Sequence, residues 1–140
     1  MKTCLIDTGP FVAYLNRNDP AHQRVAASLD NFKGQLVTTS AVVTEAMYFV
    51  SELGNGPISF AKFLAGSGVR VAESTQPGQV LDAAELMNRY SDTPMDFADA
   101  TLVLLAEEVG VTEIFTLDRR GFSTYKTPKG KAFRLAITYR

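Results

Sequence analysis

The segment 94–118, PMDFADATLVLLAEEVGVTEIFTLD, constrains the fold more than any other part of the chain. It begins with two acids, Asp96 and Asp99, continues with mostly apolar residues through Ala106, and ends in a short Ile-, Phe- and Thr-containing run that stops at Asp118. A helix this apolar is normally buried, and β-branched and aromatic residues favour a strand inside a covered sheet. We therefore expect a buried helix followed by a buried strand, with charges at both ends that are costly unless something satisfies them.

The rest of the chain shows the same alternation of short strands and helices. Strands are predicted over 2–6, 35–38, 69–72, 113–117 and 132–138, and helices over 10–14, 20–32, 40–53, 58–64, 77–90 and from Asp96 to the loop at Gly110, with Ser40 as a helix cap. Such alternation predicts right-handed crossovers and a three-layer α/β/α fold with a mainly parallel central sheet. No repeat or linker divides residues 1–140, so we expect a single domain.

Composition narrows the class of protein. The chain is 46% hydrophobic and 21% charged, which is typical of a soluble globular protein, and its apolar runs are much shorter than the ~20 residues that span a bilayer. Asp7 interrupts the first apolar run, which argues against a signal peptide, so we expect a cytoplasmic protein without a membrane partner. With one Cys and one His, an internal disulfide is excluded and a closed zinc site is implausible.

Four aspartates are predicted to meet at one edge of the sheet. Asp7 and Asp118 end predicted strands, and functional sites of parallel sheets lie beyond the carboxyl ends of the strands. The helix opened by Asp96 and Asp99 starts from this edge, because it precedes a parallel strand. For Asp96 a helix cap alone is an alternative interpretation, and an Asp at the end of a single strand is ambiguous.

Glu45 is the fifth candidate acid. It lies within the apolar stripe of the helix predicted over 40–53, which consists of Ala41, Val42, Ala46, Phe49, Val50 and Leu53. A glutamate on this stripe is expected to face the interior of the protein. The alternatives are a shifted helix face and a local salt bridge.

Carboxylates that converge at one edge repel each other unless they are protonated or bridged by a cation. Ligation by oxygen alone, without His or Cys, selects a hard ion such as Mg²⁺ or Mn²⁺. Because Mg²⁺ is typically held by a few carboxylates together with water and substrate phosphates, the pattern indicates metal-assisted phosphate chemistry.

Three motifs resemble the PIN-domain ribonucleases, and particularly the VapC-like toxins of prokaryotic toxin–antitoxin pairs. They are LIDTGPFVAYLNRNDPAHQ, TTSAVVTEAMYFV and DFADATLVLLAEEVGVTEIFTLDRRGF, which together extend over nearly the whole chain. The resemblance implies a PIN-like fold, cleavage of RNA with Mg²⁺ or Mn²⁺, a small antitoxin partner and a homodimer. It also implies an acidic site at Asp7, Glu45, Asp99 and Asp118, with Asp96 as an accessory acid.

Individual roles follow from this resemblance. Asp7 and Asp99 are expected to be direct metal ligands, Asp118 is the candidate for a second metal position, and Glu45 is expected to hold or deprotonate a water molecule. Aromatic residues on the early helices are candidates for an antitoxin groove or a homodimer contact: Tyr14, Tyr48, Phe49, Phe60 and Phe63.

Charge is distributed unevenly along the chain. Residues 1–118 contain all 15 acidic residues, whereas residues 119–140 contain basic residues and no acid. We expect Arg119, Arg120 and Lys126 to bind RNA phosphates, because an acidic pocket alone repels RNA. The remaining members of this predicted track are Lys129, Lys131 and Tyr125, the last as a base-stacking residue. The alternatives are that an arginine pairs with Asp118 or Asp96 and that the lysines only aid solubility.

Three other classes of protein are compatible with a small acidic α/β domain. A phosphoacceptor receiver domain pairs two acids after the first strand, whereas Asp7 is single, and a haloacid-dehalogenase-type phosphatase needs an acid at the position of Gly9. The third alternative is a catalytically silent PIN fold that binds RNA or protein, and cleavage of RNA would separate it from an enzyme.

Overall fold

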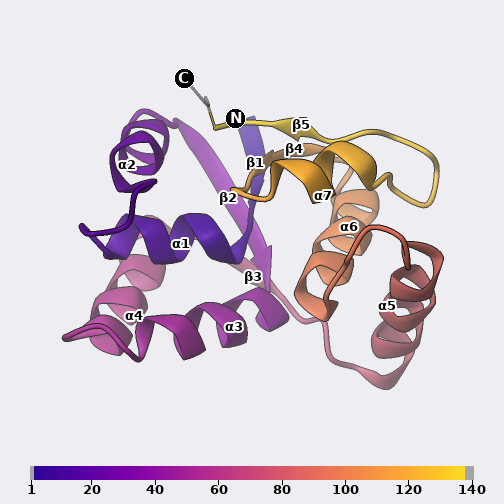
Figure 1. The fold of residues 1–140 in the computed structure, drawn as a ribbon, viewed down its shortest axis with the longest axis horizontal. Coiled ribbons are helices and arrows are strands. Elements are labelled where there is room, and N and C mark those ends of the chain that lie inside the picture. Colours follow the sequence, from indigo (N-terminus) through magenta and orange to yellow (C-terminus); the bar gives the residue numbers. More distant parts are fainter. Residues whose placement is uncertain (1, 138–140) are drawn as a thin grey trace.

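A parallel sheet forms the centre of the computed structural model, which describes residues 2–137 (Figure 1). Its strands are β1 (Lys2–Ile6), β2 (Gly34–Thr39), β3 (Arg70–Ala72), β4 (Glu113–Phe115) and β5 (Arg134–Leu135), arranged in the order β3-β2-β1-β4-β5. All neighbouring strands in this sheet run parallel, and β1 lies at the centre with Leu5 opposite Ile114 of β4. The prediction of a mainly parallel sheet is confirmed.

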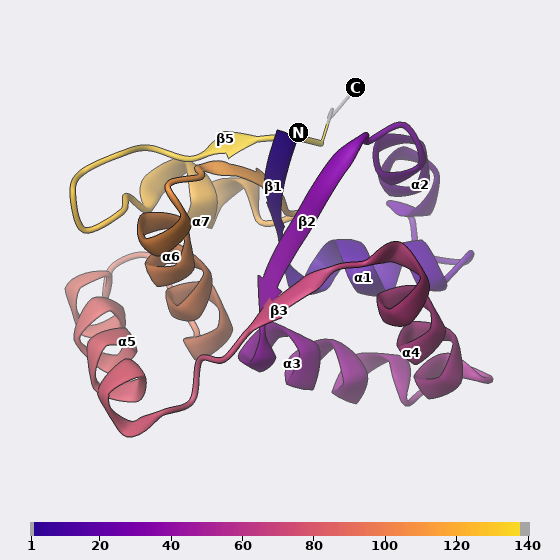
Figure 2. The same ribbon diagram turned by 180° about the vertical axis from the view of Figure 1, so that it is seen from behind.

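Helices cover both faces of the sheet. On one side lie α1 (Thr8–Leu15), α2 (His22–Asp30), α3 (Ser40–Val50) and α4 (Gly56–Ser67), and on the other lie α5 (Pro77–Arg89), α6 (Phe97–Val109) and α7 (Arg119–Thr124) (Figures 1 and 2). Right-handed crossovers explain this division, because the chain moves outward from β1 through β2 to β3 and then returns past β1 to β4 and β5. The three-layer α/β/α prediction is confirmed.

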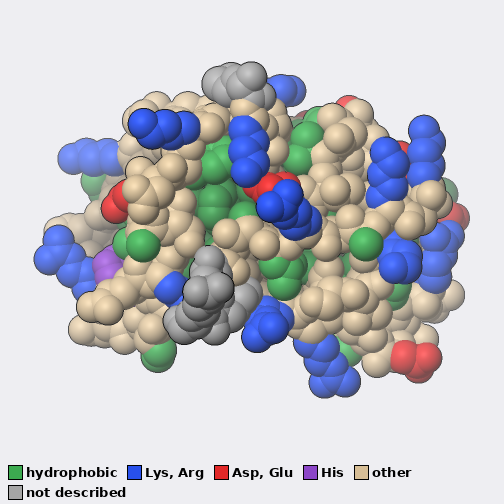
Figure 3. Space-filling view, turned by 90° about the horizontal axis from the view of Figure 1, so that it is seen from above, with side chains coloured by type: hydrophobic (Ala, Val, Ile, Leu, Met, Phe, Trp, Pro, Cys, Tyr) green, Lys and Arg blue, Asp and Glu red, His purple; other side chains and the backbone are tan. Residues whose placement is uncertain are grey.

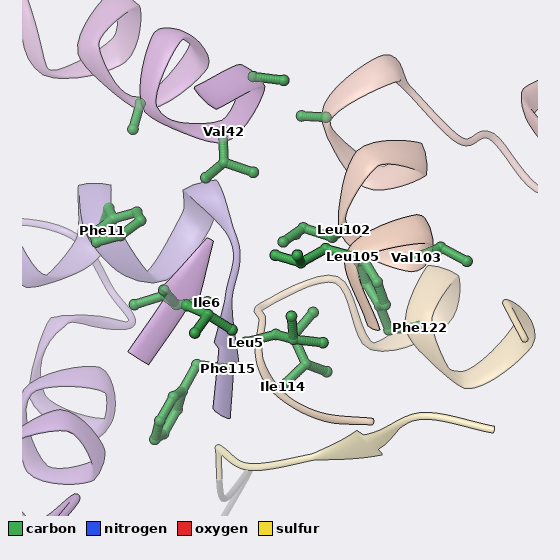
Figure 4. Close-up of a cluster of buried hydrophobic side chains, with 14 of the residues drawn as sticks. Leu5, Ile6, Phe11, Val42, Leu102, Val103, Leu105, Ile114, Phe115 and Phe122 are labelled. Carbon is green, nitrogen blue, oxygen red and sulfur yellow. The ribbon is translucent and has the colours of Figure 1, made fainter. Parts of the chain in front are cut away.

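The segment 94–118 is the helix–strand unit that its sequence predicts. Helix α6 is buried along most of its length, and its side chains Leu102 and Leu105 face Leu5 and Ile114 of the central strands (Figure 4). The helix ends at Gly110, whose positive φ of 70° is an ordinary conformation only for glycine. This unit therefore anchors the core and brings both ends of the segment, Asp96 and Asp118, to the same edge of the sheet.

Several boundaries differ from those predicted. Thr39, rather than Ser40, caps α3 by accepting a hydrogen bond from the Val42 amide. Helix α7 is absent from the predicted elements, because Gly121 interrupts a six-residue segment without apolar periodicity. The last strand is shorter than predicted, and position 138 lies outside the described residues.

Two further predictions concern the interior and the membrane. Cys4 is fully buried in β1, and burial raises the pKa of its thiol to about 12, so it acts as a small core residue. Within residues 2–137, no helix has the length and apolar character that crossing a membrane requires.

Candidate functional site

The five predicted acids line one open pocket at the carboxyl edge of the sheet. The pocket has a volume of about 510 Å³ and is lined by Asp7, Thr8, Gly9, Val12, Asp19, Glu45, Phe49, Asp96, Asp99, Leu117 and Asp118. It lies where β1 meets β4, and from β1 the chain leads first to β2 on the opposite side. This is the topological switch point, the usual position of a ligand site in an open α/β sheet.

Asp7 is held rigidly at the base of the pocket. It follows β1 and is buried, with only 7% of its surface exposed. Its Oδ1 accepts a hydrogen bond from the Thr8 amide at 2.8 Å, and its Oδ2 accepts one from the Thr116 hydroxyl, also at 2.8 Å. Thr116 in turn accepts a hydrogen bond from the Asp118 amide at 3.0 Å, so this threonine links the acids that follow β1 and β4.

Asp96 and Asp99 form a reciprocal capping box at the start of α6. The Asp99 amide donates to Asp96 Oδ1 at 2.8 Å, and the Asp96 amide donates to Asp99 Oδ2 at 3.1 Å. The capping interpretation of Asp96 is thus correct, but both side chains also line the pocket. Each carboxylate keeps acceptor capacity beyond its capping bond, because two oxygens offer about four lone-pair positions.

Asp118 caps α7 in a similar way. Its Oδ1 accepts a hydrogen bond from the Gly121 amide at 2.9 Å. A Cβ atom at position 121 would lie 2.3 Å from Asp118 Oδ2, so the carboxylate can occupy this position only because residue 121 is a glycine. Sequence analysis could not assign this role to Gly121, because it did not predict α7.

The site is therefore built from helix N-termini. Asp7 caps α1, Asp96 caps α6 and Asp118 caps α7, whereas Glu45 projects from within α3. The partial positive charge at a helix N-terminus stabilises an adjacent carboxylate. This arrangement offsets part of the repulsion among the acids while leaving them open to the pocket.

Burial and like charge dominate the electrostatics of the pocket. Burial raises the pKa of Asp7 to about 6, and the charges of Asp96 and Glu45 add to the increase. Burial also raises the pKa of Asp99 to about 8, with further contributions from Asp7 and Asp96. The pKa of Glu45 is raised mainly by burial and then by the charge of Asp96. The pocket consequently favours the uptake of protons or of a cation.

The donor set suits a hard cation. The Thr8 hydroxyl is buried beside the carboxylates and adds one more oxygen to the oxygens of the acids. The single histidine, His22, directs Nδ1 to the Ala13 carbonyl oxygen at 2.8 Å and does not line the pocket. Among residues 2–137 no three acidic, His or Cys side chains form a closed chelating group. An open arrangement of this kind resembles magnesium sites, in which a few carboxylates share the ion with water and substrate.

The predicted basic track divides into two parts. Arg119 and Arg120 are exposed at the start of α7, immediately after Asp118. Lys126 is also exposed. Its backbone forms hydrogen bonds with the hydroxyl of Tyr90, the residue that follows α5. The two arginines thus directly follow the pocket residue Asp118, whereas the backbone of Lys126 contacts Tyr90, the residue after α5.

Two members of the track are misplaced by the sequence prediction. Tyr125 is only 1% exposed and its hydroxyl donates to the Pro94 carbonyl oxygen, so the prediction that it stacks on a base is wrong. Its ring packs edge-on against Phe122 and supports the segment before α6. Lys129 is held by Glu107 through a backbone hydrogen bond and an ion pair of 3.9 Å. Glu107 lies roughly 16 Å along α6 from Asp96, which puts Lys129 away from the pocket.

Two residues at the site were not predicted. Asp19 lines the pocket, and its Oδ1 accepts a hydrogen bond from the Ala21 amide at 2.8 Å. The Asn-Asp-Pro sequence around it indicates only a turn. The buried hydroxyl of Thr8 likewise carries no sequence signal beyond its position next to Asp7.

At the opposite edge of the sheet, where the strands begin, an acidic side chain lies among basic ones. Lys and Arg side chains outnumber the acids on this face, and some of them lie against the acid near its centre (Figure 3). Glu113 at the start of β4 lies 2.8 Å from Lys2 Nζ and 3.8 Å from Arg134 Nε. Ion pairing thus compensates this carboxylate, in contrast to the mutual repulsion in the pocket.

An acidic pocket at the switch point of a parallel sheet is the arrangement expected of a metal-dependent α/β enzyme. Comparison with known families identifies which family this chain belongs to. The family model of the PIN domain matches residues 4–127. The chain belongs to the PIN domain family.

Particular relatives extend this result. Ribonuclease VapC26 of Mycobacterium tuberculosis (strain ATCC 25618 / H37Rv) is 31% identical over 131 residues, which are 92% of this chain and 96% of that protein. The crystal structure of Mycobacterium tuberculosis VapC20, a sarcin–ricin loop cleaving toxin, has a TM-score of 0.75 at 18% identity and covers 84% of this chain and 91% of that one. DNA-bound VapBC from Salmonella typhimurium has a TM-score of 0.61 at 18% identity and covers 97% of this chain and 99% of that one. The two structures share the fold.

Proposed function

We propose that this protein is a metal-dependent endoribonuclease and the toxin of a toxin–antitoxin pair. The observation that carries the proposal is the assembly of Asp7, Glu45, Asp96, Asp99 and Asp118 around one pocket in a chain of the PIN domain family. Its relative ribonuclease VapC26 supports RNA as the substrate, and so does VapC20, a sarcin–ricin loop cleaving toxin. A silent PIN module would have no need for five acids that repel each other.

Asp7, Asp99 and Asp118 would hold Mg²⁺ or Mn²⁺, with Asp96 as the accessory acid. Bound in this pocket, the ion lowers the pKa of water and neutralises charge on phosphate oxygens. The protein positions these ligands through Thr116, the capping box and the Gly121 amide. Each of these contacts fixes one oxygen of a carboxylate and leaves the group able to accept further contacts.

Glu45 is suited to accept a proton from the attacking water. It is half-buried on α3, it lines the pocket, and its raised pKa brings it closer to neutral pH than an ordinary glutamate. A general base is most effective when its pKa approaches the working pH. The side chain projects from the middle of α3, so its Cα is held in place by the helix while the capping acids approach from other elements.

A small antitoxin protein and a second copy of the chain are the proposed partners. Tyr48 and Phe49, which are 70% and 46% exposed, supply aromatic surface on α3 for such contacts. The prediction that Phe60 contributes to this surface is wrong, because its side chain is fully buried against Phe11. Tyr14 and Phe63 are half-buried and pack against each other.

Cleavage of RNA tests the proposed activity. Purified protein is expected to cleave RNA with Mg²⁺ or Mn²⁺ and to lose activity when the metal is chelated. Asp99→Asn should abolish turnover, because it removes a ligand charge while its amide oxygen can still accept the Asp96 N–H. Glu113→Gln, at the opposite edge, is the matched control and should retain activity. Full activity of Asp99→Asn would contradict the proposal.

RNA binding by the arginines beside the pocket is a separate prediction. Replacing Arg119 and Arg120 together by Ala should weaken RNA binding and flatten its salt dependence by about 0.7 in the log–log slope per lost phosphate contact. Lys126→Ala is the comparison, and a smaller change is expected there because it removes one positive charge rather than two. An unchanged slope for the double variant would place the RNA-binding surface elsewhere.

A further inference from the structure

A second hollow along α3 adjoins the acidic pocket. This hollow has a volume of about 360 Å³ and is lined by Ala41, Thr44, Glu45, Thr75, Asp96, Phe97 and Ala98. Glu45 and Asp96 line both spaces and form the partition between them. The two spaces therefore adjoin at these acids, between α3 and the start of α6, and together they are called the groove below.

An aromatic side chain lies on each side of the partition. Phe49 lines the acidic pocket and follows Glu45 by four residues, about one turn along the same helix face. Phe97 follows Asp96 directly and lines the second hollow. The acids at the centre of the groove are thus flanked by one phenyl ring on the pocket side and another on the far side.

Phe49 was predicted as part of the buried stripe of α3, and that prediction is wrong. Its side chain is 46% exposed, whereas Val42, Ala46 and Val50 of the same helix are buried. Its ring packs edge-on against Tyr48, with ring centroids 5.5 Å apart, which supports it at the pocket wall. An exposed phenylalanine beside a polar pocket contributes little to the core, so a contact with a ligand explains its position better than packing does.

The second hollow offers the chemistry that a nucleobase requires. Its walls are the small side chains of Ala41 and Ala98 and the ring of Phe97, which form a mainly apolar space. The Thr44 hydroxyl donates to the Ser40 carbonyl oxygen and the Thr75 hydroxyl donates to Glu73, so both hydroxyl oxygens retain acceptor capacity. Such oxygens can accept hydrogen bonds from the amino groups of a base, while the ring stacks on its face.

We propose that this groove binds single-stranded RNA with one base on Phe49, the next base on Phe97 and the scissile phosphate between them at the Glu45–Asp96 partition. The proposal rests on the proposed ribonuclease function and adds to it two base-binding subsites. Stacking on aromatic rings tolerates different bases, so these subsites position the strand, whereas the threonine hydroxyls on the Phe97 side give that subsite a preference for bases with an amino group.

Steady-state cleavage of a short RNA with one mapped cut site tests the two subsites. Phe49→Ala is expected to lower kcat/KM by about tenfold through loss of one stacking contact, and Phe49→Tyr should restore it. Leu81→Ala is the matched control, since Leu81 of α5 is also an exposed apolar residue, at 58%, but lines neither the acidic pocket nor the second hollow. For the half-buried Phe97, Phe97→Leu is compared with Phe97→Tyr, and thermal melting checks that each variant is folded.

Substrates with a single abasic residue identify which base each ring contacts. Removing the base on the Phe49 side should cost the wild-type protein as much as Phe49→Ala does, and should cost the variant nothing more. A second readout uses Asp99→Asn as a non-cleaving background, in which 2-aminopurine next to the cut site should lose fluorescence on binding unless Phe49 is replaced.

Each outcome separates the subsites from the proposed function. Cleavage of RNA by the wild type with unchanged kcat/KM in both phenylalanine variants would overturn the subsites and leave the ribonuclease intact. Equal losses on the intact and abasic substrates, or a change of oligomeric state in Phe49→Ala, would assign Phe49 to folding or to a protein contact instead. Absence of both cleavage and RNA binding in the wild type would overturn the two proposals together.

Discussion

The two edges of the central sheet place carboxylates in opposite environments. At the amino edge, Glu113 lies between Lys2 and Arg134, and favourable ion pairs compensate its charge. At the carboxyl edge, Asp7 and Asp99 face burial and other acids, and their pKa values rise to about 6 and about 8. The comparison shows that nearby cations compensate the carboxylate at the amino edge, whereas burial and neighbouring acids disfavour the charged form of the carboxylates at the carboxyl edge. The carboxyl edge is therefore the one suited to bind a ligand.

Each edge of the sheet contains a tightly packed glycine, so a Gly→Ala substitution can perturb one edge without the other. A Cβ at Gly121 would meet Asp118 Oδ2 at 2.3 Å, whereas a Cβ at Gly34 would meet the Lys2 carbonyl oxygen at 2.2 Å. Gly121→Ala should displace a site acid and lower RNA cleavage by about 100-fold, the effect expected of a displacement on the order of 1 Å. Activity is measured at saturating metal on folded protein.

Gly34→Ala should show the reverse pattern. The contact with backbone should cost about 1–3 kcal/mol of unfolding free energy, measured by denaturant titration, while the folded fraction keeps its activity. Gly9→Ala is a control within the pocket, because a Cβ there meets the Leu117 side chain only at 3.4 Å. Equal loss of activity in the Gly34 and Gly121 variants would show that the two edges are not functionally distinct.

The pH dependence of the unfolding free energy also distinguishes the two edges of the sheet. A carboxyl group whose pKa is raised by folding binds its proton more tightly in the folded state, so protonation of Asp7 and Asp99 stabilises the metal-free protein. Its unfolding free energy should therefore decrease as the pH rises from about 4, the ordinary aspartate range, to about 8, the raised pKa of Asp99. Denaturant titrations in a chelator measure this slope.

Two variants test whether the pH dependence of the unfolding free energy comes from the carboxyl edge. Asp99→Asn should flatten part of the decrease, because it removes the titration that extends to about pH 8 and leaves that of Asp7 and Glu45. Glu113→Gln should leave the slope as in the wild type. A stability that rises steadily over this range would mean that the pocket acids are ionised favourably and would remove the electrostatic basis of the proposed site.

The sequence alone predicts the sheet and the acids well, because both rest on strong local patterns. The short apolar run that ends at Asp7 and the apolar helix that starts at Asp96 carry their own boundaries, and parallel topology then brings their ends together. Glu45 is predicted to face inward from its position among apolar residues, and it does line the pocket.

The remaining details depend on tertiary contacts that have no local signal. Helix α7 is set by the bond between Asp118 and the Gly121 amide rather than by apolar periodicity. Tyr125 is buried because its hydroxyl reaches Pro94, which lies 31 positions earlier in the chain. Phe49 has the spacing of a core residue but is exposed at the pocket, since the helix face turns toward the groove.

Calorimetric titration of the purified protein with Mg²⁺, and with Mn²⁺ as the second ion, tests the central claim that the carboxyl edge is a cation site. The wild type and Glu113→Gln are expected to bind the ion with equal affinity and to gain thermal stability from it, because binding to the folded state alone shifts the unfolding equilibrium. Asp99→Asn is expected to bind more weakly and to gain less. Identical binding by Asp99→Asn, or the absence of binding by the wild type at millimolar metal, would contradict the assignment of this pocket.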